Sequence, residues 1–502
     1  MIALLFALSA LIAEPGAAAS PLRTPVAAHA AQDIDDLETQ LRSNDERERR
    51  TAVQELVALG SEEAWDLVLD ALEDPFGQVA DEAQLALPGL PIPLWTELTG
   101  KRGLKSKADH VPLRVAEALG RFPEALDEKV FVAALDHKDP DVRRSVLWSC
   151  ERLGYRKELS SKNGKVVDAI RALASKDKVP AVRAQALVAL ATIDPGAIQP
   201  LALEFAIAKD AVMRAAAAEM IQYLPGSRRL SSAQWARQDP AFVVRLRAYD
   251  AVAGLGERAA VAFLVESLGL EERLRLRWRL VEHLRSSSGL KHGLDERPWK
   301  DWLERLPEDW TPERGGEESE LGDEETASFA GLPVLSDRVS FLIDFSGSMW
   351  EERDGKTRKE RVDAELRTAL ERLDPEVKFN LLPFAARVLQ WQKSLTGARP
   401  RDVGKALKWF EGCKESGTGD YWSAMKQALV EPGIDTMIVL GDGAPSGGHR
   451  WNIDLMKELW RHENRFYGVA VDALLIGAKG RVRRGWGELC ETSGGRVLDV
   501  EL

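Results

Sequence analysis

A helical phrase recurs along the first half of the chain, and this repetition constrains the fold more than any other feature of the sequence. From about residue 35 to residue 285, an arginine is followed by alanines and leucines at helical spacing, at intervals of roughly 30 to 40 residues. The instances are Arg50–Gly60, Val79–Leu87, Arg114–Gly120, Arg143–Trp148, Arg183–Leu190, Arg214–Met220 and Arg245–Val252. About 30 residues hold two short helices, and such a pair cannot bury its apolar face alone. The pairs must therefore stack, which predicts an all-α solenoid.

Asp-Pro turns precede several of these phrases, at Asp74-Pro75, Asp139-Pro140 and Asp239-Pro240. Because proline suits the first turn of a helix and aspartate caps it, each turn predicts a helix start. The pattern Asp-Pro-x-Val-Arg is clearest from Asp139 to Val146, and here the phrases resemble HEAT repeats. The resemblance implies an extended interaction surface and does not by itself imply an activity.

The repeats are expected to end near residues 287–302, where a turn and a short aromatic helix cap the last of them. Residues Glu304 to Glu325 are strongly acidic and contain glycines, which is typical of a solvated linker. The predicted organisation is therefore multidomain. It comprises a signal segment (1–30), a HEAT-like α-solenoid (31–302), an acidic linker (303–335) and a C-terminal domain (336–502).

The C-terminal domain opens with an apolar run, Arg338–Asp344, that ends at an acidic residue. Its β-branched and aromatic residues predict a buried strand, and a helix is expected to follow over about 359–373. In open α/β sheets, ligands bind where loops leave the carboxyl ends of strands. The loop at that position reads Asp344-Phe-Ser346-Gly-Ser348, and alternation points its three oxygen-bearing side chains to one side. Mg²⁺ takes an octahedron of oxygens at about 2.1 Å, so this loop can supply three of them.

Two further segments can complete the coordination. Thr418 lies in a Gly-rich loop before a helical segment at 422–429, and it offers a hydroxyl. Asp442 follows a second buried strand at 436–441, and it offers a carboxylate from a neighbouring strand end. Together the segments predict one divalent cation, Mg²⁺ or else Mn²⁺ or Ca²⁺, held by five residues. These are Asp344, Ser346, Ser348, Thr418 and Asp442.

The same five residues match every position of the metal-ion-dependent adhesion site of von Willebrand factor A (VWA) domains, and residues 336–502 resemble that family. The resemblance implies an α/β doubly wound, Rossmann-like fold. It also implies that Ser346, Ser348 and Thr418 contact the metal directly, whereas Asp344 and Asp442 act mainly through water. A partner's Glu or Asp then fills the remaining position. In a degenerate site, these polar groups would instead hydrogen-bond to one another.

The resemblance favours a protein-binding scaffold in which the metal captures an acidic side chain of a partner and the repeats give a second interaction surface. One alternative is a regulatory or assembly module in which the metal is structural, although the sequence contains no P-loop. Another is that the linker glutamates between 317 and 325 occupy the open position from within the chain.

An enzyme is not expected. A metal-dependent hydrolase needs an activated metal-bound water, and hydroxyl ligands without a histidine-rich shell suit that chemistry poorly. His449 and His462 are close to Asp442 in the sequence, but they are expected on a loop and on a helix surface rather than in a catalytic role.

The net charge and the N-terminal sequence limit the expected partners and the expected location of the protein. A net charge of −12 and a pI near 5.4 oppose a phosphate-binding surface, so no nucleic-acid partner is expected. The apolar run Met1–Ala13 is shorter than the roughly 20 residues of a membrane span and suits a secretion signal. Ala28-His-Ala30 gives a cleavage motif, with Ala17–Ala19 as an alternative. We therefore expect a bacterial protein exported to the periplasm, the cell surface or the medium, without a membrane span.

The three cysteines, Cys150, Cys413 and Cys490, are too few for a disulfide framework and lack metal-ligand spacing. Buried free thiols are expected. A single bridge between Cys413 and Cys490 is the alternative, because both lie in the C-terminal domain and export would expose them to oxidising conditions.

Overall fold

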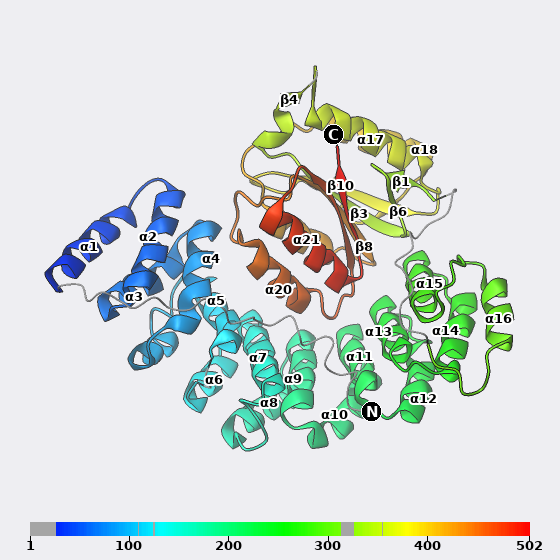
Figure 1. Cartoon of the computed structure of the whole chain (residues 1–502), viewed down its shortest axis with the longest axis horizontal. Coiled ribbons are helices and arrows are strands. Elements are labelled where there is room, and N and C mark those ends of the chain that lie inside the picture. Colours follow the sequence, from blue (N-terminus) through cyan, green and yellow to red (C-terminus); the bar gives the residue numbers. More distant parts are fainter. Residues whose placement is uncertain (1–26, 109, 124–125, 313–325, 354, 502) are drawn as a thin grey trace.

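The computed structural model describes residues 27–108, 110–123, 126–312, 326–353 and 355–501. It arranges them as an arc of helices with an α/β region lying against the inner side of the arc (Figure 1). The apolar run of the predicted signal lies outside the described residues, and so does the acidic run from Glu317 to Glu325. None of the helices within the described ranges is long and apolar enough to cross a lipid bilayer.

Within the described residues, the arc contains sixteen α-helices. In chain order they are α1 (Ala27–Gln40), α2 (Glu46–Leu59), α3 (Glu62–Asp70), α4 (Gly77–Ala86), α5 (His110–Ala118), α6 (Glu128–Leu135), α7 (Pro140–Tyr155), α8 (Gly164–Lys176), α9 (Pro180–Ile193), α10 (Ile198–Ala206), α11 (Ala211–Glu219), α12 (Gly226–Ala236), α13 (Phe242–Ala253), α14 (Arg258–Leu270), α15 (Leu274–Ser288) and α16 (Glu296–Glu304). Successive helices pack antiparallel in pairs along the arc, as the repeated phrase predicts (Figure 1).

An arginine at the start of several of the repeated phrases, or directly before it in the case of Arg49, has a structural role that recurs along the arc. Its guanidinium reaches the carboxylate in the turn before the next inner helix and ties neighbouring repeats together. The shortest nitrogen-to-oxygen distances are 2.7 Å for Arg49–Asp74, 2.8 Å for Arg143–Asp177, 2.6 Å for Arg214–Asp239 and 2.9 Å for Arg245–Glu271. The same arginine also donates to a backbone carbonyl six residues earlier, as Arg143 does to His137 at 2.8 Å. The guanidinium therefore connects the turn before its own helix to the turn of the following repeat.

The Asp-Pro turns behave in two ways. At Asp139 the prediction is confirmed, because α7 begins at Pro140 and the Asp139 carboxylate accepts a hydrogen bond from the amide of Asp141 at 2.9 Å. At Asp74 and Asp239 it is wrong by two residues, since α4 begins at Gly77 and α13 at Phe242. There the carboxylates also accept from the amide two residues on, but this closes a turn ahead of the helix.

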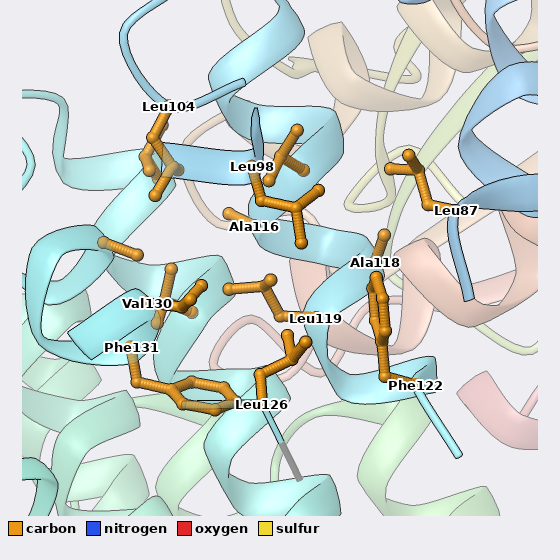
Figure 2. Close-up of a cluster of buried hydrophobic side chains, with 14 of the residues drawn as sticks. Leu87, Leu98, Leu104, Ala116, Ala118, Leu119, Phe122, Leu126, Val130 and Phe131 are labelled. Carbon is orange, nitrogen blue, oxygen red and sulfur yellow. The ribbon is translucent and has the colours of Figure 1, made fainter. Parts of the chain in front are cut away.

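The core of the arc consists of two clusters of mostly aliphatic side chains between the helices, and α9 contributes residues to both clusters. Figure 2 shows one section of the core, where Leu119, Leu126, Val130 and Phe131 gather in the same cluster. At the far end, Trp299 of α16 is fully buried and packs edge-on against Trp302. The aromatic helix therefore covers the last repeat, as predicted.

The C-terminal region is built on a six-stranded sheet with the order β10-β9-β8-β3-β6-β7. The strands of this region are β1 (Ser328–Phe329), β2 (Leu332–Pro333), β3 (Arg338–Asp344), β4 (Glu352–Arg353), β5 (Lys356–Thr357), β6 (Lys378–Phe384), β7 (Thr396–Gly397), β8 (Thr436–Gly441), β9 (Ala470–Ile476) and β10 (Val497–Val500). The helices are α17 (Arg358–Arg372), α18 (Pro400–Glu411), α19 (Tyr421–Leu429), α20 (Ile453–Glu463) and α21 (Gly480–Ser493).

Helices cover both faces of this sheet. Along β3, Phe341 and Ile343 pack with α17 and α18, whereas Leu342 packs with α19, α20 and α21 on the opposite face. The sheet is mixed, because β7 pairs antiparallel with β6 and the other pairings are parallel. The chain returns from β6 to β7 without an intervening helix, so the short edge strand runs backward.

The segment between the arc and the sheet is structured at its C-terminal end. β1 and β2 form an antiparallel hairpin within the stretch assigned to the linker from sequence. Phe329 of this hairpin is fully buried and meets Phe341 of β3 edge-on, with ring centroids 5.5 Å apart. The α/β region therefore includes residues 328–334 in its core.

All three cysteines are buried and free. Cys413 packs in the layer of α17 and α18, and Cys490 packs in the layer of α19 to α21, so the sheet separates them. The alternative of a bridge between them is therefore wrong.

Polar side chains on α4, α5, α7, α9 and α11 line the inner face of the arc, and they are spaced by 33 or 34 residues along the chain. We call Gln84, Glu117, Glu151, Gln185 and Glu219 the polar stripe. Two arginines of the α/β region dock on it. Arg450 contacts Gln84 and Glu117, and Arg465 contacts Glu151 and Glu219. The predicted concave surface of the solenoid is thus occupied by the chain's own C-terminal region.

His462 lies between these anchors, and the expectation that it sits on a helix surface is wrong. It is 2% exposed and stacks on Trp148 of α7, with ring centroids 4.9 Å apart. Burial lowers the pKa of His462 well below its usual value. The charged side chains around it are Arg144, Glu463, Arg465 and Lys426. In the docked state this imidazole therefore stays neutral under conditions in which an exposed imidazole takes up a proton.

Acidification is expected to weaken the docking through this histidine. Below about pH 6.5 the undocked imidazole takes up a proton and the docked one does not, so docking loses about 1.4 kcal/mol per pH unit. Amide exchange of α20 between pH 5 and 7, corrected for the intrinsic exchange rate, measures the effect. A His462→Phe variant keeps a ring against Trp148 and is expected to lose this slope. The same slope in wild type and variant would assign it to another group.

Candidate metal centre

Three loops converge at one edge of the sheet. β3 ends at Asp344, and β8 ends one residue before Asp442. These two strands are parallel neighbours, with Ile343 opposite Leu440, so both aspartates leave the sheet at the same place. The loop containing Thr418 joins them, because the amide of Gly347 donates to the carbonyl of Gly417 at 3.0 Å. This is the carboxyl edge at which α/β sheets bind ligands.

The first loop is shaped by its own aspartate. Asp344 is fully buried, and its Oδ1 accepts a hydrogen bond from the amide of Ser346 at 2.7 Å. The chain then turns into a short 3₁₀ helix, η7 (Gly347–Trp350), which brings Ser348 alongside Ser346. Their hydroxyl oxygens are 3.4 Å apart. Two of the predicted ligands are therefore held side by side by local backbone geometry.

Asp442 closes the cluster from the neighbouring strand. Its Oδ2 accepts a hydrogen bond from the hydroxyl of Ser348 at 2.9 Å, and its Oδ1 accepts one from the amide of Ala444 at 2.9 Å. Four of the five predicted ligands, Asp344, Ser346, Ser348 and Asp442, thus form one connected group. Hydrogen bonds within such a group are also the arrangement expected of a degenerate site, so the metal itself has to be tested.

Thr418 lies at the rim of this group. Its side chain is exposed, and its hydroxyl packs against Gly447 of the loop that follows Asp442. The next residue, Gly419, packs against Ser346 and Asp344. Among the described residues, no hydrogen bond joins Thr418 to the other four predicted ligands. Its position at the site therefore rests on the backbone around Gly419.

Tyr421 is a site residue that the sequence did not reveal. Its hydroxyl donates to Asp344 Oδ2 at 2.7 Å, accepts from the amide of Gly443 at 2.9 Å and lies 3.4 Å from Asp442 Oδ1. The ring is fully buried and packs edge-on against Trp486. Burial raises the pKa of the Tyr421 phenol well above its usual value, so the hydroxyl keeps its proton and donates it to Asp344, with Asp442 close by. In the sequence, only its position three residues after Thr418 indicates that Tyr421 could lie near the predicted metal ligands.

The electrostatics of the group suit a cation. Burial, together with the charge of nearby Asp442, raises the pKa of Asp344 to about 6, even though Tyr421 and the amide of Ser346 donate to it. Within the described residues, no three His, Cys, Asp or Glu side chains cluster at metal-binding spacing. Any ion here would depend on the serine and threonine hydroxyls. Carboxylate and hydroxyl oxygens are the donor set of a hard cation such as Mg²⁺, so the residues present fit it.

The two histidines near Asp442 do not form a catalytic pair with it. His449 is exposed and stacks on His110 of α5, with ring centroids 6.2 Å apart. His462 is buried against Trp148, as described above. Both therefore belong to the contact between the arc and the α/β region.

Comparisons with known proteins support the repeats directly. The HEAT repeat family (HEAT_2) matches residues 129–222, which confirms HEAT repeats over that range. The chain is 31% identical over 130 residues to human inter-alpha-trypsin inhibitor heavy chain H4, covering 24% of this chain and 13% of that protein. It is 29% identical over 129 residues to human heavy chain H2, covering 23% and 13%. The matched part is thus a small fraction of these relatives.

Two solved structures show a weaker likeness. One is an aerotolerance-related membrane protein from Bacteroides fragilis, with a TM-score of 0.26 and 16% identity over 32% of this chain and 90% of that one. The other is the S. pombe condensin Cnd3-Cnd2 subcomplex, with a TM-score of 0.32 and 17% identity over 56% of this chain and 43% of that one. Scores this low carry no conclusion about function. The repeats and the α/β region together suggest a protein-interaction module.

Proposed function

We propose that the α/β region is a doubly wound domain of the VWA type that binds a divalent cation and presents it to an acidic side chain of a partner protein. The supporting observation is the convergence of Asp344, Ser346, Ser348 and Asp442 at the carboxyl edge, with the Asp344 carboxyl buried close to that of Asp442. Mg²⁺ is the expected ion, with Mn²⁺ and Ca²⁺ as alternatives.

The five predicted ligands have two roles in this proposal. Ser346, Ser348 and Thr418 offer neutral hydroxyl oxygens to the cation. Asp344 and Asp442 provide the negative charge, and the hydroxyl of Tyr421 lies between their carboxylates. When bound, the cation would supply a positive centre that these few charges leave under-neutralised. A carboxylate from outside is the group that best completes such a site. We propose no catalytic step.

The arc provides the second surface in this proposal. Its inner stripe already holds the α/β region, so a partner would contact the outer face or the rims of the repeats. We also propose export to the periplasm, the cell surface or the medium, on the strength of the apolar run Met1–Ala13. Sequencing the N-terminus of the mature protein tests this part separately.

The expected result for the binding function is that Asp442→Ala abolishes both Mn²⁺ binding and Mg²⁺-dependent capture of partner proteins. Losing a carboxylate from the cluster removes its main negative charge facing Ser348. Mn²⁺ titration of the full chain measures the first effect, and pull-down with and without chelator measures the second. The matched control is Asp499→Ala, an aspartate whose side chain is 59% exposed and pairs only with Arg483.

Three outcomes separate the alternatives. If the wild-type chain binds no Mn²⁺, the cluster is a degenerate site. If it binds Mn²⁺ but captures the same partners after chelation, the metal is structural, as in a regulatory or assembly module. Capture that is lost with chelator and with Asp442→Ala, but kept by Asp499→Ala, supports the proposed function.

A further inference from the structure

The loop that carries Asp442 runs directly into the arc. The carbonyl of Gly448 accepts a hydrogen bond from the amide of Gly77, the first residue of α4, at 3.1 Å. One residue later, the carbonyl of His449 accepts from the guanidinium of Arg114 at 2.7 Å. The amides of Trp451 and Asn452 both donate to Asp81, at 2.7 and 2.8 Å. Within ten residues, therefore, the chain passes from a predicted metal ligand to a set of backbone contacts with the solenoid.

Glycines let this loop approach both sides closely. A Cβ on Gly77 would lie 2.6 Å from the carbonyl oxygen of Gly448, so the solenoid backbone and the loop are in direct contact there. On the other side, Gly447 packs against the hydroxyl of Thr418, and Gly448, which has φ +79°, packs against Asp420. The loop is thus held between the solenoid and the Thr418 loop, with no room for an added side chain.

A buried set of charges fixes the same loop. Arg450 is 5% exposed and donates to both oxygens of Glu117, each at 2.8 Å, and to Gln84 at 2.7 Å. Arg114, which is 1% exposed, donates to Asp81 at 2.7 Å and to Gln84 at 2.9 Å. Two arginines and two carboxylates therefore balance one another, and three of these four side chains, Asp81, Arg114 and Glu117, belong to helices α4 and α5 of the solenoid. Undocking the loop would remove Arg450 and leave the buried Glu117 carboxylate without the guanidinium that donates to it.

We infer that the solenoid regulates the metal site, because docking of the loop 443–452 on α4 and α5 holds Asp442 and Thr418 in the arrangement that binds the cation. This inference rests on the proposed function. Docking and metal binding stabilise the same arrangement of one loop, so each favours the other. Such linkage is reciprocal, so the cation also strengthens the docking.

The test uses a variant that disturbs the docking without touching a predicted ligand. Gly77→Ala places a methyl group against the Gly448 carbonyl, and it is expected to weaken Mn²⁺ binding by the full-length chain about five- to tenfold. Gly164→Ala is the matched control, because Gly164 is also the first residue of a solenoid helix and an added Cβ there meets nothing within 4 Å. It is expected to bind Mn²⁺ as the wild type does.

A second variant guards against a folding defect in the first. Glu117→Gln is nearly isosteric, and the chain itself carries glutamine at the equivalent position of the preceding α-helix, Gln84 of α4. It removes one charge opposite Arg450 and is expected to weaken Mn²⁺ binding in the same direction. Conversely, Mn²⁺ is expected to slow amide exchange of α4 in the wild-type chain, although α4 contributes no ligand.

The outcomes separate the inference from the proposed function. Equal Mn²⁺ affinity in wild type, Gly77→Ala and Glu117→Gln would overturn the inference and leave the metal site intact. An equal loss in Gly164→Ala would also overturn it, because the effect would then not depend on the docked loop. A wild-type chain that binds no Mn²⁺ would defeat the proposed function itself.

Discussion

Replacing Arg450 with alanine is expected to open the contact between the arc and the α/β region, at a cost of about 3–5 kcal/mol. The reason is the burial of what remains. Glu117 is 3% exposed, and Arg450 is the cation that donates to both of its carboxylate oxygens. Without Arg450 the carboxylate keeps only the amide of Gln84, at 2.7 Å. A buried charge that has lost its partner destabilises far more than the pair stabilises.

Native-state amide exchange measures this opening, because two backbone amides of the loop are hydrogen-bonded within the contact between the arc and the α/β region. The amides of Trp451 and Asn452 donate to Asp81 only while the loop is docked. Their protection therefore reports the free energy of opening without requiring the whole chain to unfold in one step. In Arg450→Ala these amides are expected to exchange hundreds-fold faster, since about 1.4 kcal/mol corresponds to a factor of ten.

The control is an arginine with the same bidentate geometry but an exposed partner. Arg237 contacts Glu266 through two nitrogens at 2.9 Å, and the Glu266 side chain is 56% exposed. Arg237→Ala is expected to change the free energy of unfolding by about 1 kcal/mol or less and to leave the two reporter amides unchanged. Unaltered exchange in Arg450→Ala would mean that hydrophobic contacts, rather than this ion pair, hold the loop.

The second large effect is expected at Tyr421. Tyr421→Phe keeps the packing against Trp486 but removes the hydroxyl that donates to Asp344 and accepts from Gly443. Groups that orient metal ligands typically contribute 10- to 100-fold to metal affinity, so Mn²⁺ binding is expected to fall by about that factor. The titration used for Asp442→Ala measures this change.

A second tyrosine provides the matched control. Tyr249 is also buried, and its hydroxyl donates to Glu271 at 2.8 Å within the arc. Tyr249→Phe and Tyr421→Phe should each lose about 1–3 kcal/mol of stability, because each leaves a buried polar partner unsatisfied. Only Tyr421→Phe should lose metal affinity. Equal Mn²⁺ affinity in the two variants would show that Tyr421 supports the fold without orienting Asp344.

The parts of the fold that the sequence predicts are those encoded by local spacing. Helical periodicity with a recurring arginine predicts the arc, and β3 and β8 span the residues expected of them, Arg338–Asp344 and Thr436–Gly441. The loop Asp344-x-Ser346-x-Ser348 places its side chains together because they are two residues apart on one short segment. Asp442 joins them because parallel strands end at the same edge.

What the sequence did not reveal depends on contacts between distant segments. Arg450 and Glu117 are separated by 333 residues, and neither carries a mark that distinguishes it from a surface charge. The polar stripe is visible only once the helices that carry it are known to lie side by side. His462 was assigned to a helix surface because the surface that buries it belongs to α7, in another part of the chain.

The two arginine anchors also fix how many repeats the arc can contain between them. Arg450 hydrogen-bonds to Gln84 and Glu117 of the polar stripe. Arg465 follows after one short helix and hydrogen-bonds to Glu151 and Glu219. A solenoid can usually gain or lose a unit without penalty, since each unit contacts only its neighbours. Here an added unit between α4 and α11 would carry one anchor point out of reach of its arginine. Docking of the α/β region therefore restricts the length and curvature of the arc between α4 and α11. Repeats should be gained or lost only before α4 or after α11.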